Sequence, residues 1–314
     1  MLDRLQQALQ DAQTQRNRAD EAAAHQQLGA AYQALGQSHL ALEHLQAALS
    51  LQRECQNPGG EAAALHAQGG IYASLGEMAR ALECYRQALT LRRATHDRTG
   101  ESATLNNLAI VHSALGQKSE ALRNYLKTLD IDTELGDRQG EAITLNNIGE
   151  IYRALKRPRD AINYYRQSLN LHRELGDRRG EAITLNNLGE LNLQDKLFDA
   201  ALTHFQRAVA IRREVGDRRG EAITLDNLGQ VYFALNQLSD ALPHAQQALS
   251  IIQEIDERWL ETSMLYHVGQ LLHAAGRTAE ARSTLKQAVR LAQALSHPLL
   301  TDCCTALDKL DHPV

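Results

Sequence analysis

Hydrophobic residues recur along most of the chain in pairs of segments separated by a short polar break. Within each segment they fall three or four positions apart, which is the spacing of one face of an α-helix. The apolar positions of one such pair are Ile143, Leu145, Ile148, Ile151, Tyr152 and Leu155, then Ala161, Ile162, Tyr165, Leu169 and Leu171. Each pair of segments therefore predicts two antiparallel helices.

The same pattern returns every forty residues. The stretch 176–190 reappears at 216–230 with only Asn186 and Glu190 changed, to Asp226 and Gln230, and an earlier copy covers 136–150. One column of glutamates, meaning positions related by steps of forty, runs along the chain as Glu21, Glu61, Glu101, Glu141, Glu181, Glu221 and Glu261. A fixed period of this length is typical of repeats that pack on their neighbours. The fold class predicted is an all-α solenoid of helix-turn-helix repeats.

The repeat also predicts how the chain is divided. Residues 1–20 match only the second helix of a repeat and are expected to form an N-terminal capping helix. Seven repeats follow, and residues 301–314 are expected to be a C-terminal capping segment. The repeats are 21–60, 61–100, 101–140, 141–180, 181–220, 221–260 and 261–300. The last is irregular, and its Trp259 is expected to pack against the end of the array rather than serve as a binding hot spot.

Turn residues mark the corners between the predicted helices. The left-handed position that ends a helix is expected at Gly36, Gly76, Gly116 and Gly276, with Lys156, Lys196 and Asn236 as substitutes, and between repeats at Gly136, Gly176 and Gly216. N-caps are expected at Asp137, Asp177 and Asp217 and, for the second helices, at Ser38, Ser119, Asp199, Ser239 and Thr278. The recurring glutamate and the arginine three residues before it are expected to stabilise these corners rather than bind a ligand.

The composition narrows the classes of partner. A formal net charge of -5, without a clustered basic excess, excludes a nucleic-acid or anionic-membrane surface. No apolar run approaches a secretory leader or a membrane span, so a cytoplasmic protein is expected. The four cysteines show no CxxC spacing and are interpreted as reduced thiols.

No residue pattern indicates catalysis. The thirteen histidines are spread through the repeats without metal-ligand spacing, and the glycines stand singly at corners rather than in a phosphate-binding loop. No Ser-His-Asp or Cys-His arrangement stands out from the repeat. The protein is expected not to be an enzyme and to need no cofactor or metal.

The columns that carry the apolar pattern are Leu28, Gly29, Tyr32, Ala41, Leu45 and Ala48 in the first repeat, and Leu188, Gly189, Ala201, Phe205 and Ala208 in the fifth. This order of large and small residues resembles the tetratricopeptide repeat. The repeat is longer than the usual unit of about 34 residues and lacks the proline near the end of the second helix. The forty-residue form resembles spindle-orientation scaffolds with Leu-Gly-Asn repeats, kinesin light chain and bacterial sensory arrays.

The resemblance implies a right-handed superhelix whose concave surface is lined by the first helix of each repeat. Two adjacent columns of that helix would face the groove, and both are rich in asparagine. They are Asn106, Asn146, Asn186 and Asp226, and beside them Asn107, Asn147, Asn187 and Asn227. These residues are the predicted peptide-binding set.

A carboxamide can pair with both the N–H and the C=O of an extended backbone, so such a ladder can hold a main chain without reading its side chains. The alternative is that one asparagine of each pair only hydrogen-bonds the neighbouring helix. We expect a non-enzymatic scaffold or adaptor that binds an extended peptide segment in the concave groove.

Specificity is expected from less repetitive groove positions. One column carries Glu150, Glu190 and Gln230, and the next carries Arg153 and Phe233. Acidic, basic and apolar side chains alternate there. The expected partner is a protein or peptide whose bound segment has basic and apolar side chains.

Two other functions remain open at this stage. A ligand- or peptide-sensing module acting on a separate effector is one, because bacterial regulators resemble such arrays. An enzymatic function is the other, if a pocket forms at the irregular C-terminal repeat.

Overall fold

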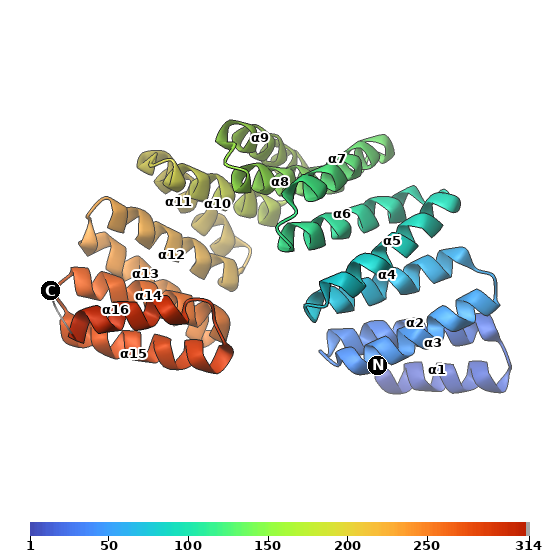
Figure 1. Ribbon diagram of the computed structural model, residues 1–314. Helices are drawn as coiled ribbons and strands as arrows, with labels where there is room; N and C mark the ends of the chain where they lie inside the picture. Colours follow the sequence, from blue (N-terminus) through green and yellow to red (C-terminus); the bar gives the residue numbers. More distant parts are fainter. Residues whose placement is uncertain (312–314) are drawn as a thin grey trace. The chain divides into compact units, whose positions relative to one another are not determined.

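A computed structural model describes residues 1–311, which form sixteen α-helices and no strand (Figure 1). The helices are α1 (Leu2–Thr14), α2 (Arg18–Ala34), α3 (Ser38–Glu54), α4 (Pro58–Ser74), α5 (Met78–Ala94), α6 (Arg98–Ala114), α7 (Lys118–Leu135), α8 (Arg138–Ala154), α9 (Pro158–Leu175), α10 (Arg178–Gln194), α11 (Phe198–Glu214), α12 (Arg218–Ala234), α13 (Leu238–Glu254), α14 (Arg258–Ala274), α15 (Thr278–Leu295) and α16 (Leu300–Asp311). The predicted all-α class is confirmed. The last three residues of the predicted cap 301–314 lie outside the described range.

The chain forms two compact units, which we call the N-terminal half (1–157) and the C-terminal half (158–314). In the N-terminal half each helix from α1 to α8 packs on the next, and in the C-terminal half α9 to α16 do the same. First helices also contact one another, as α2 does α4 and α10 does α12. This consecutive packing of helix pairs is the architecture of a solenoid.

Left-handed residues end the helices where the sequence predicts them. Gly136 has φ of 68°, and the glycine substitutes Lys156 and Asn236 have φ of 56° and 59°. After Gly136, the Asp137 side chain accepts a hydrogen bond of 2.9 Å from the Gly140 amide and so caps α8. Asp177 and Asp217 cap α10 and α12 in the same way.

The predicted N-caps of the second helices are wrong. Ser38 and Thr278 are the first residues of α3 and α15, and the capping positions before them are Gln37 and Arg277, neither of which makes a side-chain cap bond. Ser119, Asp199 and Ser239 likewise lie inside their helices. At both kinds of corner the capping position directly follows the left-handed residue, as Gln37 follows Gly36 and Asp137 follows Gly136. The second helices therefore begin one or two residues sooner than the predicted caps would require.

The core of each helix pair joins a small residue to a large one. Gly189 on α10 lies against the fully buried Phe205 of α11, where an added Cβ would come within 2.5 Å of the ring. The alanine column of the second helices, Ala41, Ala81, Ala121, Ala161, Ala201, Ala241 and Ala281, is completely buried. These positions let the helices approach closely, as the apolar pattern predicted.

The C-terminal half is closed by α16. Leu310 is buried against Val268, Leu271, Leu272 and Leu285 of the last repeat. Trp259 was expected to pack against this end, and its ring centroid does lie 4.2 Å from that of His297, but the side chain stays 47% exposed.

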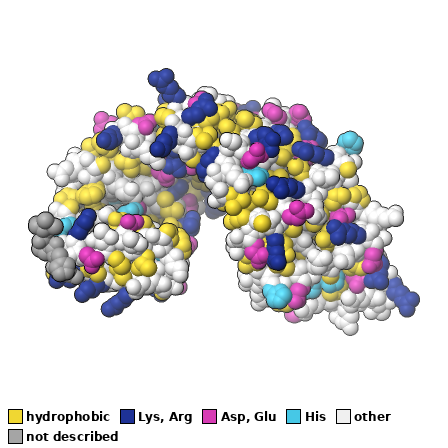
Figure 2. All heavy atoms as spheres, in the orientation of Figure 1, with side chains coloured by type: hydrophobic (Ala, Val, Ile, Leu, Met, Phe, Trp, Pro, Cys, Tyr) yellow, Lys and Arg dark blue, Asp and Glu magenta, His cyan; other side chains and the backbone are white. Residues whose placement is uncertain are grey.

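The surface mixes charges of both signs. Figure 2 shows Lys and Arg side chains lying among Asp and Glu over the face in view, without a field of one sign. Across residues 1–311, no helix combines the length and the apolar character needed to cross a membrane.

Candidate functional site

The predicted asparagine columns lie on the first helices and contact one another from helix to helix. In the N-terminal half, Asn147 Nδ2 on α8 lies 3.5 Å from Asn106 Oδ1 on α6. Asn107 Nδ2 makes the equivalent contact, at 3.2 Å, with His66 Nε2 on α4. In both contacts the second residue of one pair bonds the first residue of the preceding pair.

His66 fits this ladder because it is neutral. Burial, aided by the nearby charge of Arg92, lowers the pKa of His66 to about 4. Neutral imidazole accepts at one nitrogen and donates at the other. Nε2 can therefore accept from Asn107 while Nδ1 donates to Thr104 Oγ1, 3.2 Å away.

The ladder continues in the C-terminal half with a change of chemistry. Asn227 Nδ2 donates to Asn186 Oδ1 at 3.2 Å and to Glu190 Oε1 at 3.4 Å. One repeat later, His267 Nδ1 lies 2.8 Å from Asp226 Oδ2. A carboxylate and an imidazole therefore stand where two carboxamides stand in the repeat before.

The two columns differ in exposure. Asn186 and Asp226 are buried, whereas Asn107, Asn147, Asn187 and Asn227 are half-buried, as are Asn106 and Asn146. The interhelix bonding that the sequence left open is thus present for Asn107, Asn147 and Asn227. Asn147 uses one N–H in this bonding. The Asn107 amide bonds His66 and also the Tyr85 hydroxyl, and the Asn227 amide donates to both Asn186 and Glu190. No bond to the carbonyl oxygens of these three asparagines is seen within residues 1–311.

The predicted specificity columns contain local pairs. Arg153 donates to Glu150 at 2.8 Å, so in α8 the acid and the base partly neutralise each other. Glu190 accepts from Asn186 at 2.8 Å, and Gln230 donates to Asp226 at 2.9 Å. Phe233 makes no such pair and is 41% exposed.

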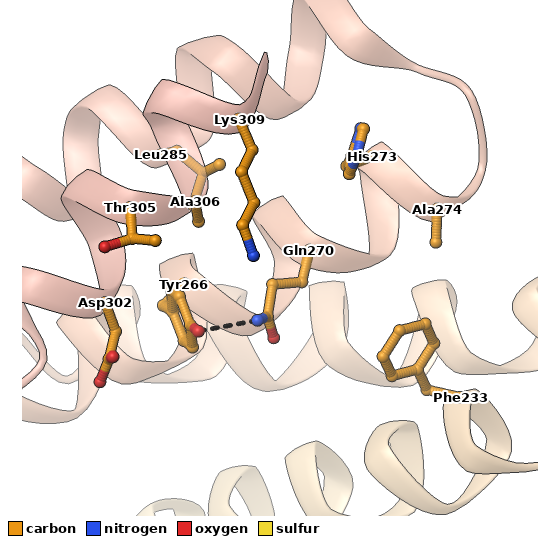
Figure 3. A pocket seen from close by; sticks show the side chains of 10 residues that line it. All are labelled: Phe233, Tyr266, Gln270, His273, Ala274, Leu285, Asp302, Thr305, Ala306 and Lys309. Carbon is orange, nitrogen blue, oxygen red and sulfur yellow. Dashed lines mark hydrogen bonds between the residues drawn. The ribbon is translucent and has the colours of Figure 1, made fainter. Parts of the chain in front are cut away.

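A pocket does form at the irregular C-terminal repeat, where the sequence left one open without naming its wall. A cavity of about 360 Å³ opens in the C-terminal half between α12, α14 and α16 (Figure 3). Its wall includes Phe233, Tyr266, Gln270, His273, Asp302 and Lys309. Figure 3 shows the Lys309 side chain extending from α16 toward Gln270, whose amide donates to the Tyr266 hydroxyl at 2.7 Å.

The signal for this pocket in the sequence was weak. Tyr266 and His273 lie in columns that had been assigned to the groove, but Lys309 belongs to the cap, outside the repeat. Burial, together with the negative charge of Asp302, raises the pKa of Tyr266, so its hydroxyl keeps its proton at neutral pH.

A group that sequence reasoning missed lies at the joints between repeats. The column Gln52, Arg92, Asp132, His172 and Arg212 is polar although it falls on the apolar face of the second helices. All five side chains are buried. Each lies beside a glycine in the first helix of the following repeat. Arg92, for example, lies beside Gly100, where a Cβ added to the glycine would come within 2.7 Å of Arg92 Nε.

The described residues hold no group of three or more histidine, cysteine, aspartate or glutamate side chains that could bind a metal ion. The four cysteines are free thiols, as expected, and burial raises the pKa of Cys303 to about 11.

Comparison with known protein families gives two matching family models, both described as tetratricopeptide repeat. One matches residues 60–134, 120–174, 140–214 and 180–254. The other matches residues 22–55 and 262–295. No curated protein matches the chain significantly.

Solved structures with the same fold are numerous and distant in sequence. The apo form of RapI is 16% identical, with a TM-score of 0.72 over 88% of this chain and 99% of RapI. A second match is a signal transduction ATPase with numerous domains from Pyrococcus horikoshii, which carries a tetratricopeptide repeat sensor. It is 19% identical, with a TM-score of 0.69 over 86% of this chain and 40% of that protein. A putative kinesin light chain from Podosopora anserina is 17% identical, with a TM-score of 0.53 over 62% of this chain and 95% of its own.

Proposed function

Because the chain belongs to the tetratricopeptide repeat family, we propose that it is a non-enzymatic scaffold or adaptor that binds an extended segment of another protein across its first helices. One observation carries this proposal. Asn107, Asn147 and Asn227 keep a carbonyl oxygen beyond the bonds that hold them, and Asn147 also keeps an N–H. Their half-burial leaves these groups within reach of a ligand.

The ladder gives the asparagines a fixed direction. A side chain held by its neighbour loses less conformational freedom when a ligand binds, so more of each new hydrogen bond contributes to affinity. Each N–H or C=O of the bound backbone then pairs with a carboxamide. Asn107 and Asn147 would bind the peptide backbone in the N-terminal half, and Asn187 and Asn227 would bind it in the C-terminal half.

Within the predicted set, we assign different work to the two columns. Asn186 and Asp226 are buried and orient the outer residues, whereas Asn107, Asn147, Asn187 and Asn227 meet the peptide. Phe233 offers apolar surface to a hydrophobic side chain of the partner. Glu190 and the Glu150–Arg153 pair offer charge to a basic one.

The test begins with a partner captured on the immobilised full chain and the bound segment mapped. Affinity for that segment is then measured by calorimetry for the triple variant Asn107→Ala, Asn147→Ala and Asn227→Ala. With about 1 kcal/mol for each lost bond, we expect affinity to fall about a hundredfold. Unchanged affinity would contradict groove binding.

Two control variants separate contact from architecture. Asn163→Ala removes an exposed asparagine from a second helix and should leave affinity unchanged. Asn186→Ala removes the side chain that accepts the hydrogen bond of Asn227, and this side chain is itself buried. If Asn186→Ala alone weakens binding as much as the triple variant, the ladder only positions the helices.

A second candidate function is a ligand-sensing regulatory module, which the C-terminal pocket favours. Its 360 Å³ lies in the ordinary range for small-molecule sites, and Lys309 gives it one cation beside the polar Gln270 and Tyr266. A set of small organic carboxylates, screened by thermal shift, tests it. Stabilisation that is lost in Lys309→Ala supports this function, and no stabilisation by any of them rejects it.

A further inference from the structure

The buried polar column shows how the joints between repeats are filled. At the joint after the second repeat, an Arg92 N–H bonds the Gly100 carbonyl and another contact of 2.7 Å reaches Thr104 Oγ1. Arg92 Nε lies 3.8 Å from Asp97, the N-cap of α6. Its guanidinium thus occupies a site made by a carboxylate, a carbonyl and a hydroxyl.

Three other joints also place a polar side chain of this column against the N-cap residue of the next helix. Arg212 bonds the Gly220 carbonyl and lies 3.8 Å from Asp217. At a third joint His172 Nδ1 lies 2.9 Å from Asp177. At the joint after the first repeat the direction is reversed, because the capping Asn57 donates to the Gln52 side-chain oxygen at 2.8 Å. In these four joints the chain itself supplies the polar group that meets the cap.

The joint after the third repeat breaks the rule. Asp137, Gly140 and Thr144 correspond to Asp97, Gly100 and Thr104, but the column residue is the acid Asp132. An acid therefore faces an acid. A cavity of about 220 Å³ lies there, lined by these four residues together with Ser102 and Asn106, and we call it the joint cavity.

Asp132 is held firmly in this position. Its side chain is only 3% exposed and accepts hydrogen bonds from Ser102 Oγ and, at 3.1 Å, from Thr144 Oγ1. Ser102 and Thr262 are the two hydroxyl residues of a column that is otherwise alanine, at Ala22, Ala62, Ala142, Ala182 and Ala222. Burial, and to a smaller extent the charges of Asp137 and Glu141, raise the pKa of Asp132. Within residues 1–311 no basic side chain is seen bonded to its carboxylate.

We propose that the joint cavity binds a guanidinium group, supplied by an arginine side chain of the bound protein segment. The partner would place there the group that Arg92 and Arg212 place from within the chain. The source of the arginine rests on the proposed function, whereas the affinity of the cavity for guanidinium does not.

The lining favours guanidinium over ammonium. The planar group carries five N–H donors in a fork, which suits two carboxylates and a carbonyl around one space, whereas an ammonium is a point charge with a strong hydration shell. Leu135 and Ile143, each 46% exposed, line the same cavity. They provide apolar contact for the methylene stem of an arginine.

The experiment titrates the full chain with Nα-acetyl-arginine amide and follows the Ile143 δ1-methyl resonance by NMR. The expected dissociation constant is about 1 mM. Nα-acetyl-citrulline amide, which has the same shape without the charge, should bind at least about tenfold more weakly. Equal shifts with both probes, or none with arginine amide, would overturn the proposal.

Three variants sharpen the result. Asp132→Asn should weaken arginine amide binding about tenfold or more, whereas Asp130→Asn, an exposed acid on the same helix, should leave it within about twofold. Asp132→Arg restores the arrangement of the Arg92 joint, so it should fold, fill the cavity and abolish binding. If a folded Asp132→Arg variant binds arginine amide like the native chain, the site lies elsewhere.

The proposed function can fail independently. If arginine amide binds the joint cavity but no protein segment binds the first helices, the cavity assignment stands and the peptide function falls. If a protein segment binds equally well to the native chain and to Asp132→Arg, the function stands and the cavity has no part in it.

Discussion

At the scale of single residues, the pair Asp226 and His267 shows how the ladder can change without being broken. It replaces the pair Asn186 and Asn227 one repeat later, and both members change together. Burial opposes the charge on His267, but the carboxylate of Asp226, through its charge and its hydrogen bond, raises the pKa of the imidazole. The contact becomes an ion pair when His267 is protonated.

The pH dependence of this pair follows from the direction of that shift. A histidine whose pKa is higher in the folded than in the unfolded state binds more protons when folded, so its stabilising effect is complete below the unfolded pKa and lost as pH rises through the folded pKa. We predict that NMR titration places the pKa of His267 above 6.5. In Asp226→Asn only burial remains, and the pKa should fall below 6.5. A pKa that is the same in both proteins would contradict the assignment.

At the scale of helices, the close approach of each pair rests on a small residue facing a large one. Gly189 is such a position, because an added methyl would meet the Phe205 ring at 2.5 to 2.8 Å. Gly70 lies in the helix interior too, but an added methyl there meets nothing closer than the Tyr85 hydroxyl at 3.6 Å.

The two glycines therefore predict opposite effects of the same substitution. Gly189→Ala should lower the free energy of unfolding by about 1–3 kcal/mol through overpacking. Gly70→Ala should raise it by about 0.5–1 kcal/mol, because alanine favours the helix and nothing is displaced. Urea unfolding followed by circular dichroism measures both. Equal effects would show that packing at Gly189 is looser than the structure indicates.

The corner glutamates connect three successive helices. Glu221 is 3% exposed at its side chain and pairs with Arg213 of α11 at 2.7 Å and with Arg218 of α12 at 2.8 Å. Arg218 also reaches Glu254 of α13 at 2.8 Å. This network supports the structural interpretation of the glutamate column.

Breaking one corner should have a modest, salt-dependent cost. The arginines are about half exposed, so solvent screens the pairs, and we predict a loss of about 1 kcal/mol for Glu221→Gln at low salt, shrinking in 1 M NaCl. Glu257→Gln breaks only the exposed pair with Arg219 and should cost almost nothing. Unfolding midpoints at both salt concentrations test the difference.

At the scale of the whole molecule, each repeat depends mainly on its neighbours. Leu310 of α16 is 5% exposed and completes the apolar cluster of the last repeat. Because coupling in repeat arrays passes from neighbour to neighbour, damage at one end should remain local.

Leu310→Ala tests that locality. We predict that it destabilises the last repeat by about 2–3 kcal/mol, since a buried leucine leaves a cavity when it is truncated. Hydrogen exchange should quicken in α14, α15 and α16 and stay unchanged in α2 to α5. Faster exchange throughout would instead indicate that the chain unfolds as one cooperative unit.

Much of this architecture could be predicted from local sequence. The positive φ of Lys156 and Asn236 follows from their place at a helix end, and the capping of α8 by Asp137 needs only residues three positions apart. The N-caps proposed at Ser38 and Thr278 failed because the capping position directly follows the left-handed glycine, which places it at Gln37 and Arg277. A residue with a good capping side chain does not cap when it stands one position too late in the turn.

The sequence by itself determined the helix pairs, their corners, the family and the columns of polar residues, because each depends on spacing within a helix or on an exact repeat. Only the tertiary structure decided that Asn147 meets Asn106, that Asp132 faces Asp137 across a cavity, and that Lys309 joins Gln270 in a pocket. Those relations depend on the distance and rotation between packed helices, which many side chains set together.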